Sequence, residues 1–223
     1  MKYLCNLFLS LKEVILMIIL QYAVLFFCFI VFGPENSIII GTVILIILQI
    51  AYVIYKICID KICDFDFKNT NYFPYVLLGI GISSVYNMII FKLINPSDST
   101  TSIPFFLNII CSGIVGPIFE EFLFRHDLIK RLYRFNSNKF VIIILASIIF
   151  GLFHTGTITI IYAIIIGIVN SYIYVNSRNI IKPIVVHMAA NIFVNLLTGY
   201  NLNIMIFGLV LIIISYFIIK YNN

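Results

Sequence analysis

Residues 14–32 read VILMIILQYAVLFFCFIVF, a long apolar run without a charged side chain. A helix of about 20 apolar residues can cross roughly 30 Å of hydrocarbon, and it satisfies its own backbone hydrogen bonds there. Similar runs recur along the rest of the chain, with almost no alternation of apolar and polar residues of the kind that strands show. The sequence therefore predicts an all-α fold, a polytopic membrane helical bundle.

The composition agrees with a membrane protein. Of the 223 residues 62% are hydrophobic and only 10% are charged, with a mean hydropathy of +1.12. A soluble domain is about half apolar and a quarter charged, so this chain lacks the polar side chains to cover a water-facing surface. We expect a single membrane domain over 1–223. Its parts would be N-terminal scaffold helices (1–103), a core with the polar motifs (104–198) and a final helix (199–223).

Apolar runs separated by turn residues predict about eight transmembrane helices. Their bounds are roughly 13–32, 38–59, 74–94, 104–129, 140–154, 158–175, 183–198 and 203–219, with a turn expected at 95–98. If the N-terminus is cytoplasmic, twelve of the fourteen Lys and Arg residues fall on the inner side. They are Lys2, Lys12, Lys56, Lys61, Lys68, Lys130, Arg131, Arg134, Lys139, Arg178, Lys182 and Lys220. This bias predicts that both termini are cytoplasmic.

The same bias explains the net charge of +5, so no nucleic-acid partner is expected. The abundance of Ile, Asn and Lys is typical of an AT-rich genome. We therefore expect a multi-pass protein of a cell membrane, the plasma membrane of a bacterium.

The fourth expected span carries charges among its phenylalanines. Residues 116–127 read GPIFEEFLFRHD. At about 2.5–3.5 kcal/mol each, Glu120, Glu121 and Arg125 would cost roughly 8–10 kcal/mol to insert, while the apolar residues of the span return only about 4–7. This helix should therefore be shielded by other helices or line a wet cavity. A charge cluster that only pins helices together is the alternative, although charges inside a membrane are usually functional.

Helical spacing separates the two glutamates. Glu121 and Arg125 are four residues apart with the acid first, the favoured order for an ion pair. Glu120 points about 100° away from that pair, so it has no local partner and could serve as a general base. Pro117 lacks an amide hydrogen and clashes with the carbonyl of Gly113, which predicts a kink just before the glutamates.

Two further motifs contain histidine. Residues 150–154 read FGLFH and end in His154, and residues 187–191 read HMAAN. His187 and Asn191 are one turn apart and share a helical face. Either motif alone is weak. Counted from the cytoplasmic basic loops at 1.5 Å per residue, Glu120, His154 and His187 lie roughly 16, 22 and 8 Å deep, so tilted helices could bring them together.

These motifs resemble those of the CAAX-protease and bacteriocin-processing family of intramembrane proteases, also called CPBP or Abi. That family shows EExxxR, FxxxH and HxxxN or HxxxD in this order on separate membrane helices. Here the motifs fall at 120–125, 150–154 and 187–191, and the resemblance covers about 104–198. One departure is His126, where bacterial members often have glycine.

The resemblance implies an intramembrane endopeptidase similar to the CAAX prenyl protease 2 enzymes. The candidate catalytic residues are Glu120, His154, His187 and Asn191, and the supporting pair is Glu121 with Arg125. The first glutamate and the FxxxH histidine would activate a water, and the HxxxN pair would stabilise the oxyanion. The substrate would be a peptide or a membrane protein in the lipid bilayer. Substrate identity and oligomeric state stay open.

Other interpretations remain. The favoured mechanism is a glutamate-type one that requires no metal, but Glu120, His154 and His187 could instead hold zinc with an open fourth position. A bacteriocin self-immunity or binding protein could use the same scaffold. A small proton-coupled transporter also places Glu and His in mid-membrane, although the two halves of this chain show no repeat.

Overall fold

The computed structural model describes residues 2–60, 65, 71–94, 103–134, 136–197 and 199–222. The expected turn at 95–98 and the basic residues Lys61 and Lys68 lie outside these ranges. Within them all regular elements are helices, so the all-α prediction is confirmed. The helices are α1 (Lys2–Asp60), α2 (Phe73–Ile94), α3 (Phe105–Asn108), α4 (Gly116–Glu121), α5 (Ile129–Leu132), α6 (Lys139–Leu152), α7 (Thr157–Ser177), α8 (Ile181–Val194) and α9 (Leu202–Asn222).

Two π-helical segments join α3, α4 and α5 into one continuous helix. These are η1 (Ile109–Val115) and η2 (Phe122–Leu128). The resulting rod carries the two glutamates in its middle, with a wider helical turn on each side of them. Single π turns inside α-helices are frequent at functional sites, because they change the direction in which side chains leave the helix.

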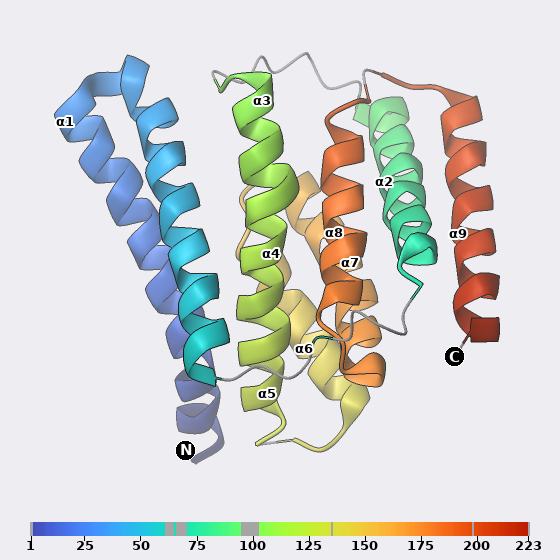
Figure 1. The fold of residues 1–223 in the computed structure, drawn as a ribbon, viewed down its shortest axis with the longest axis horizontal. Coiled ribbons are helices and arrows are strands. Elements are labelled where there is room, and N and C mark those ends of the chain that lie inside the picture. The colour runs from blue at the N-terminus through green and yellow to red at the C-terminus, as the bar shows by residue number, and fades with distance from the viewer. Residues whose placement is uncertain are drawn as a thin grey trace.

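Helix α1 is a hairpin rather than one rod. Its apolar part, Leu11–Ile59, is 49 residues long and would measure about 74 Å if straight, more than twice the hydrocarbon thickness. Gly33 breaks it with φ 72° and ψ 174°, a backbone conformation that glycine adopts without a Cβ penalty. Pro34 then begins the second arm, and the two arms lie side by side (Figure 1). The break falls between the first two expected spans.

Five helices of the described chain are long and apolar enough to cross a membrane. They are Leu11–Ile59, Phe73–Leu93, Phe105–Leu132, Thr157–Ser177 and Leu202–Tyr221. Helices α6 and α8 have only 14 residues each, about 21 Å, which is shorter than a full span. The helices therefore support a multi-pass membrane protein, whereas the count of eight spans and the cytoplasmic termini stay predictions. Both termini lie toward the same end of the bundle (Figure 1).

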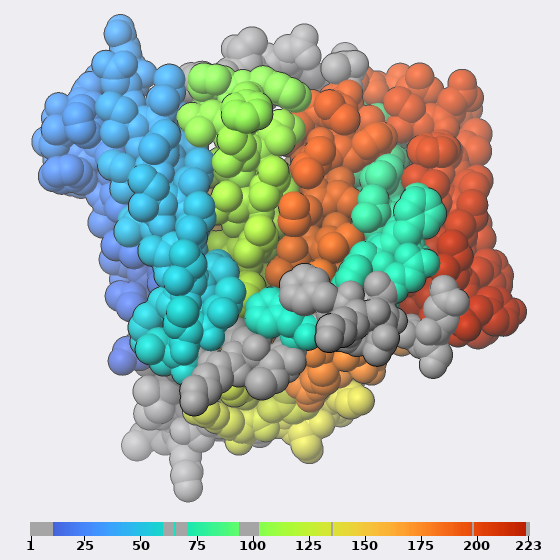
Figure 2. Space-filling view, in the orientation of Figure 1, coloured from blue at the N-terminus to red at the C-terminus, as the bar shows by residue number. Residues whose placement is uncertain are grey.

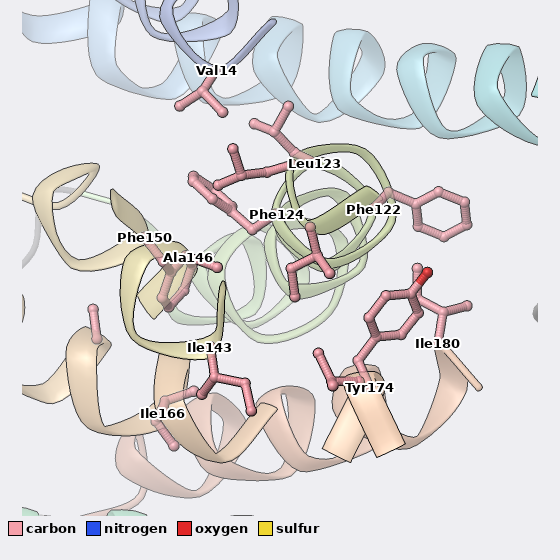
Figure 3. Close-up of a cluster of buried hydrophobic side chains, with 14 of the residues drawn as sticks. Val14, Phe122, Leu123, Phe124, Ile143, Ala146, Phe150, Ile166, Tyr174 and Ile180 are labelled. Atoms are coloured by element: carbon pink, nitrogen blue, oxygen red, sulfur yellow. The ribbon is translucent and has the colours of Figure 1, made fainter. Parts of the chain in front are cut away.

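The hydrophobic core surrounds the rod at α4 and η2. Most of its buried side chains come from the rod, from α6 and from α7, and they include Phe119 and Ile142. Figure 3 labels others of this core, among them Phe122, Leu123, Phe124, Ala146, Phe150, Ile166 and Tyr174. The rings of Phe124 and Phe150 meet edge to face with centroids 5.0 Å apart. The other helices thus shield the charged helix, as the insertion arithmetic requires.

Helix α8 is held close to its neighbours by a small residue. A Cβ on Gly79 of α2 would come within 2.2 Å of the carbonyl oxygen of Val186, so the two backbones touch beside His187. Figure 2 shows α8 beside the rod on one face of the molecule, with the α1 hairpin on one flank and α2 and α9 on the other. The helix with the HxxxN motif is therefore packed directly between the rod and α2.

Candidate active site

Glu121 joins three helices through its carboxylate. The side chain is fully buried, and its Oε2 lies 3.0 Å from Nε of Arg125. Its Oε1 accepts from Nδ2 of Asn170 on α7 at 2.9 Å and lies 2.9 Å from Nδ1 of His187 on α8. The ion pair expected from the four-residue spacing is present. The contacts with α7 and α8 come from 49 and 66 residues away in sequence.

Phe150 separates the buried cation from the two histidines. The guanidinium carbon of Arg125 lies 4.8 Å from the centre of the Phe150 ring, within cation–π range. The same ring meets His154 and His187 edge to face, with centroids 4.9 and 5.7 Å apart. The first residue of the FxxxH motif therefore fixes the positions of all three polar groups.

Glu120 differs from its neighbour in both exposure and partners. Its side chain is 17% exposed, against 0% for Glu121. Its Oε2 lies 3.7 Å from Nε2 of His187, beyond hydrogen-bond distance, and has no hydrogen-bond partner among the described residues. This oxygen is itself buried, so the exposed part of the side chain lies elsewhere on Glu120.

His154 lies two residues after the last residue of α6, Leu152, and its Nδ1 lies 3.0 Å from the carbonyl oxygen of Phe150. A carbonyl only accepts hydrogen bonds, so Nδ1 carries the hydrogen and Nε2 of a neutral ring is an acceptor. In the described chain no hydrogen bond or ion pair joins His154 to Glu120. The two groups expected to share a water are therefore not in direct contact with each other.

Asn191 bonds to a carbonyl that the helix of the rod leaves unpaired. The amide hydrogen of Gly116 bonds to Cys111 in η1, and Pro117 has none to give, so neither can reach the carbonyl of Ser112. That carbonyl accepts instead from Nδ2 of Asn191 at 2.9 Å. At the position of the expected kink the chain forms a π turn, which accommodates the proline ring while the chain stays helical. Pro117 thus leaves the Ser112 carbonyl free to accept a hydrogen bond from Asn191 of α8.

Three of the four expected catalytic residues line one cavity of about 320 Å³. His154, His187 and Asn191 contribute to its wall, together with Ser112 and Tyr162. Glu120 is joined to the same group of residues through its 3.7 Å approach to His187. The cavity is large enough for several atoms of a peptide beside a water.

Comparison with known proteins identifies the segment that contains this site. Residues 102–193 match the family described as type II CAAX prenyl endopeptidase, Rce1-like. The predicted resemblance, drawn over about 104–198, is confirmed.

Three curated bacterial proteins are similar to the chain. The putative membrane peptidase YdiL of Bacillus subtilis is 32% identical over 120 residues, 54% of this chain and 46% of that protein. The membrane-embedded CAAX protease MroQ of Staphylococcus aureus is 28% identical over 140 residues, 54% of this chain and 56% of MroQ. The UPF0177 protein YxdF of Lactococcus lactis is 31% identical over 98 residues, 44% of this chain and 53% of YxdF. The matches thus span about half the length of these relatives. No solved structure matches the chain.

The described residues form no cluster of three possible metal ligands. No three His, Cys, Asp or Glu side chains among them lie close enough together to hold one metal ion, and this includes the set expected for zinc, Glu120, His154 and His187. Whether the site uses a metal stays a prediction.

Two polar groups of the candidate active site, the Asn170 side chain and the Ser112 carbonyl, were not predicted from the sequence. Asn170 is fully buried and donates to both Glu121 and the carbonyl of Pro183, at 2.9 and 3.3 Å. Its signal was available, since it is an amide in the middle of an apolar span, where polar side chains bond across helices. The carbonyl of Ser112 had no such signal, because it depends on the π geometry of η1.

Proposed function

We propose that the chain is an intramembrane endopeptidase of a bacterial plasma membrane, cleaving a peptide bond in a peptide or a membrane protein. The observation that carries the proposal is the cavity of about 320 Å³ where His154, His187 and Asn191 meet, with Glu120 3.7 Å from His187. Membership of residues 102–193 in a CAAX endopeptidase family supports the same reaction.

The proposed reaction begins with a water held between Glu120 and His154. The carboxylate of Glu120, which is partly exposed, accepts a proton from the water, while Nε2 of His154 accepts the second hydrogen as a hydrogen bond and orients the nucleophile. The water oxygen forms a bond to the substrate carbonyl carbon, and the carbonyl oxygen becomes an oxyanion. Collapse of this intermediate breaks the carbon–nitrogen bond, and the leaving amine takes the proton back from Glu120.

The oxyanion would be stabilised from α8. Nδ1 of His187 is held by Glu121, so its Nε2 faces Glu120 and the reacting groups, where the protonated ring can donate. Asn191 uses one amide hydrogen on Ser112 and has a second to donate. Each such donor is worth about 10²–10³ in rate in a known oxyanion hole.

The charges of the site would balance during this reaction. Glu120 and Glu121 contribute two negative charges, and Arg125 with a protonated His187 contributes two positive ones. Buried charges are tolerated when they are paired and hydrogen-bonded. Glu121, Arg125 and Asn170 thus act by positioning the reacting groups, without touching substrate.

The test compares Glu120→Gln with the parent protein in vesicles that contain a fluorescence-quenched peptide with a prenylated C-terminal cysteine. We expect cleavage to fall at least about 100-fold, because the general base is lost. Glu35→Gln is the matched control, since Glu35 is exposed near the tip of the α1 hairpin. Cleavage by Glu120→Gln at the parent rate would show that the proposed mechanism is wrong.

Two further measurements separate the alternatives. Parent activity retained in a chelator, with no stoichiometric zinc in the purified protein, is the expected result for a mechanism without metal. Loss of activity that returns with zinc would favour the zinc mechanism. Protection of cells against a peptide toxin that survives Glu120→Gln would favour immunity by binding over proteolysis.

A further inference from the structure

A second cavity lies at the opposite side of α8 from the rod, between the ends of four helices. Its volume is about 660 Å³, compared with about 320 Å³ for the candidate active site. The polar groups in its wall come from α2, α7, α8 and α9 and include Tyr75, Tyr172, Asn176, Lys182, Tyr216 and Lys220. The first turn of α2, the last turns of α7 and α9 and the first turn of α8 line this cavity. The C-terminal end of α9 lies toward the same end of the bundle as the N-terminus (Figure 1). The basic-residue pattern predicts that this end is cytoplasmic.

Lys182 is a largely buried residue whose ammonium, at the wall of the cavity, has no anionic partner in the described chain. The residue is only 8% exposed and lines the cavity, and its ammonium lies 5.4 Å from the centre of the Tyr75 ring. No hydrogen bond or ion pair joins it to another described residue. Buried lysines are almost always paired, because a charge loses its hydration on burial. A ring face compensates this loss only in part.

The second cation makes the imbalance larger. Lys220 lies in the same wall, with its ammonium 5.9 Å from the centre of the Tyr216 ring. No Asp or Glu of the described chain lines this cavity, so it holds two positive charges and no negative one. Lys220 is an exposed residue, so its ammonium stays hydrated, and an anion bound in the cavity would be attracted by both lysines.

Lys56, in another basic cavity of the molecule, shows what a compensated lysine looks like. That cavity has a volume of about 580 Å³ and is lined by Lys56, Lys130, Arg131 and Arg134, but also by Glu13 and Asp127. Nζ of Lys56 lies 2.8 Å from Oδ2 of Asp127 and 3.0 Å from Oε2 of Glu13, so this ammonium is compensated within the protein. The described residues that line the cavity at Lys182 and Lys220 include no such carboxylate.

We propose that the cavity at Lys182 and Lys220 binds the phosphate group of an anionic phospholipid. Two ammonium groups and nearby tyrosine hydroxyls suit a phosphate oxygen cluster, and Ile173 and Ile219 provide apolar wall beside them. Basic pockets between membrane helices on the cytoplasmic side bind anionic headgroups in this way. The same phosphate chemistry could come from free inorganic phosphate, and the apolar wall and the position at a membrane surface favour the lipid.

A bound headgroup would hold the first turn of α8. Lys182 is five residues before His187 on that helix, about 7.5 Å along its axis. The carbonyl of Pro183 in the same turn accepts from Asn170, which also donates to Glu121. The lipid site would thus support the helix that presents the HxxxN pair.

The experiment titrates phosphatidylglycerol into the purified full-length protein in detergent and counts bound lipids by native mass spectrometry. We expect Lys182→Gln and Lys220→Gln each to weaken binding about fivefold, as loss of one surface-proximal cation does. Lys92→Gln is the matched control and should bind like the parent. It also removes a lysine from above a tyrosine ring, with Lys92 5.9 Å from the Tyr200 ring centre, but at the other end of α2.

Two further titrations distinguish a lipid phosphate from free inorganic phosphate. Phosphatidylcholine should bind more weakly than phosphatidylglycerol, and inorganic phosphate should not displace the lipid at millimolar concentration. Equal binding of both lipids, an equal loss in Lys92→Gln, or binding of inorganic phosphate alone would overturn the proposal. If Lys182→Gln does not fold, Lys220→Gln and the charge-conserving Lys182→Arg decide, and we expect only the latter to bind like the parent.

Discussion

Replacing Pro117 by alanine should stabilise the protein and slow its reaction at the same time. The carbonyl of Ser112 accepts from Asn191 only because Gly116 bonds to Cys111 and Pro117 has no amide hydrogen. Pro117→Ala supplies that hydrogen inside the helix. The rod can then close its own hydrogen bonds, and the side chain of Asn191 loses its anchor.

Both effects have magnitudes that can be worked out. Proline in a helix interior costs about 3 kcal/mol relative to alanine, an upper bound here because the π turn already accommodates the ring. The bond between Asn191 and Ser112 is worth about 0.5–1.5 kcal/mol. Since 1.4 kcal/mol is a factor of ten, we expect cleavage to slow by about 2- to 10-fold while the free energy of unfolding rises.

The assay is a double-mutant cycle with Asn191→Ala, in which cleavage of the vesicle-bound peptide and unfolding in mixed micelles are both measured. In the Asn191→Ala background Pro117→Ala should still stabilise the protein but should no longer slow cleavage, because the anchor is already gone. A Pro117→Ala variant that slows cleavage equally in both backgrounds would refute the reasoning. If Pro117→Ala instead lowered the free energy of unfolding, the inference that the Ser112 carbonyl lacks a partner within the helix would be wrong.

Two predictions concern the buried charges. Glu121→Gln should lower the free energy of unfolding by about 3–5 kcal/mol, because Arg125 then keeps its charge without a carboxylate partner. Glu120→Gln should change the free energy of unfolding by less than about 1 kcal/mol. Denaturant unfolding in mixed micelles measures both, and equal losses would contradict the different roles assigned to the two glutamates. Asn170→Leu removes a hydrogen bond to a charged acceptor and should cost about 1.5–3 kcal/mol of unfolding free energy by the same measurement. An unchanged stability would mean that Asn170 does not hold Glu121 in place.

The helical fold could be predicted from the sequence because the membrane imposes it. Long apolar runs allow few structures other than helices, and the expected break after residue 32 coincides with the positive φ of Gly33. The pair of Glu121 with Arg125 was predictable too, since it depends only on spacing within one helix. Both inferences rest on local rules.

The rest of the site depends on contacts between helices. Asn170 reaches Glu121 from another helix, and no periodicity gives the distance between them. The π turn at η1 forms because backbone hydrogen bonds run to the fifth preceding residue instead of the fourth, as from Gly116 to Cys111. The sequence predicted only a kink at this position. The meeting of Asn191 with Ser112 follows from that shift and could not be inferred before it was seen.

Adjacent glutamates acquire different chemistry from the direction in which each leaves the rod. The carboxylate of Glu121 points inward, where Arg125, Asn170 and His187 occupy it and no water reaches its fully buried atoms. The carboxylate of Glu120, turned about 100° away, is 17% exposed and keeps an oxygen without a hydrogen-bond partner in the described chain. Proton transfer to a nucleophilic water requires an accessible oxygen with a free lone pair. Of the two glutamates only Glu120 has a partly exposed side chain, while Glu121 compensates the buried cation and holds His187 beside it.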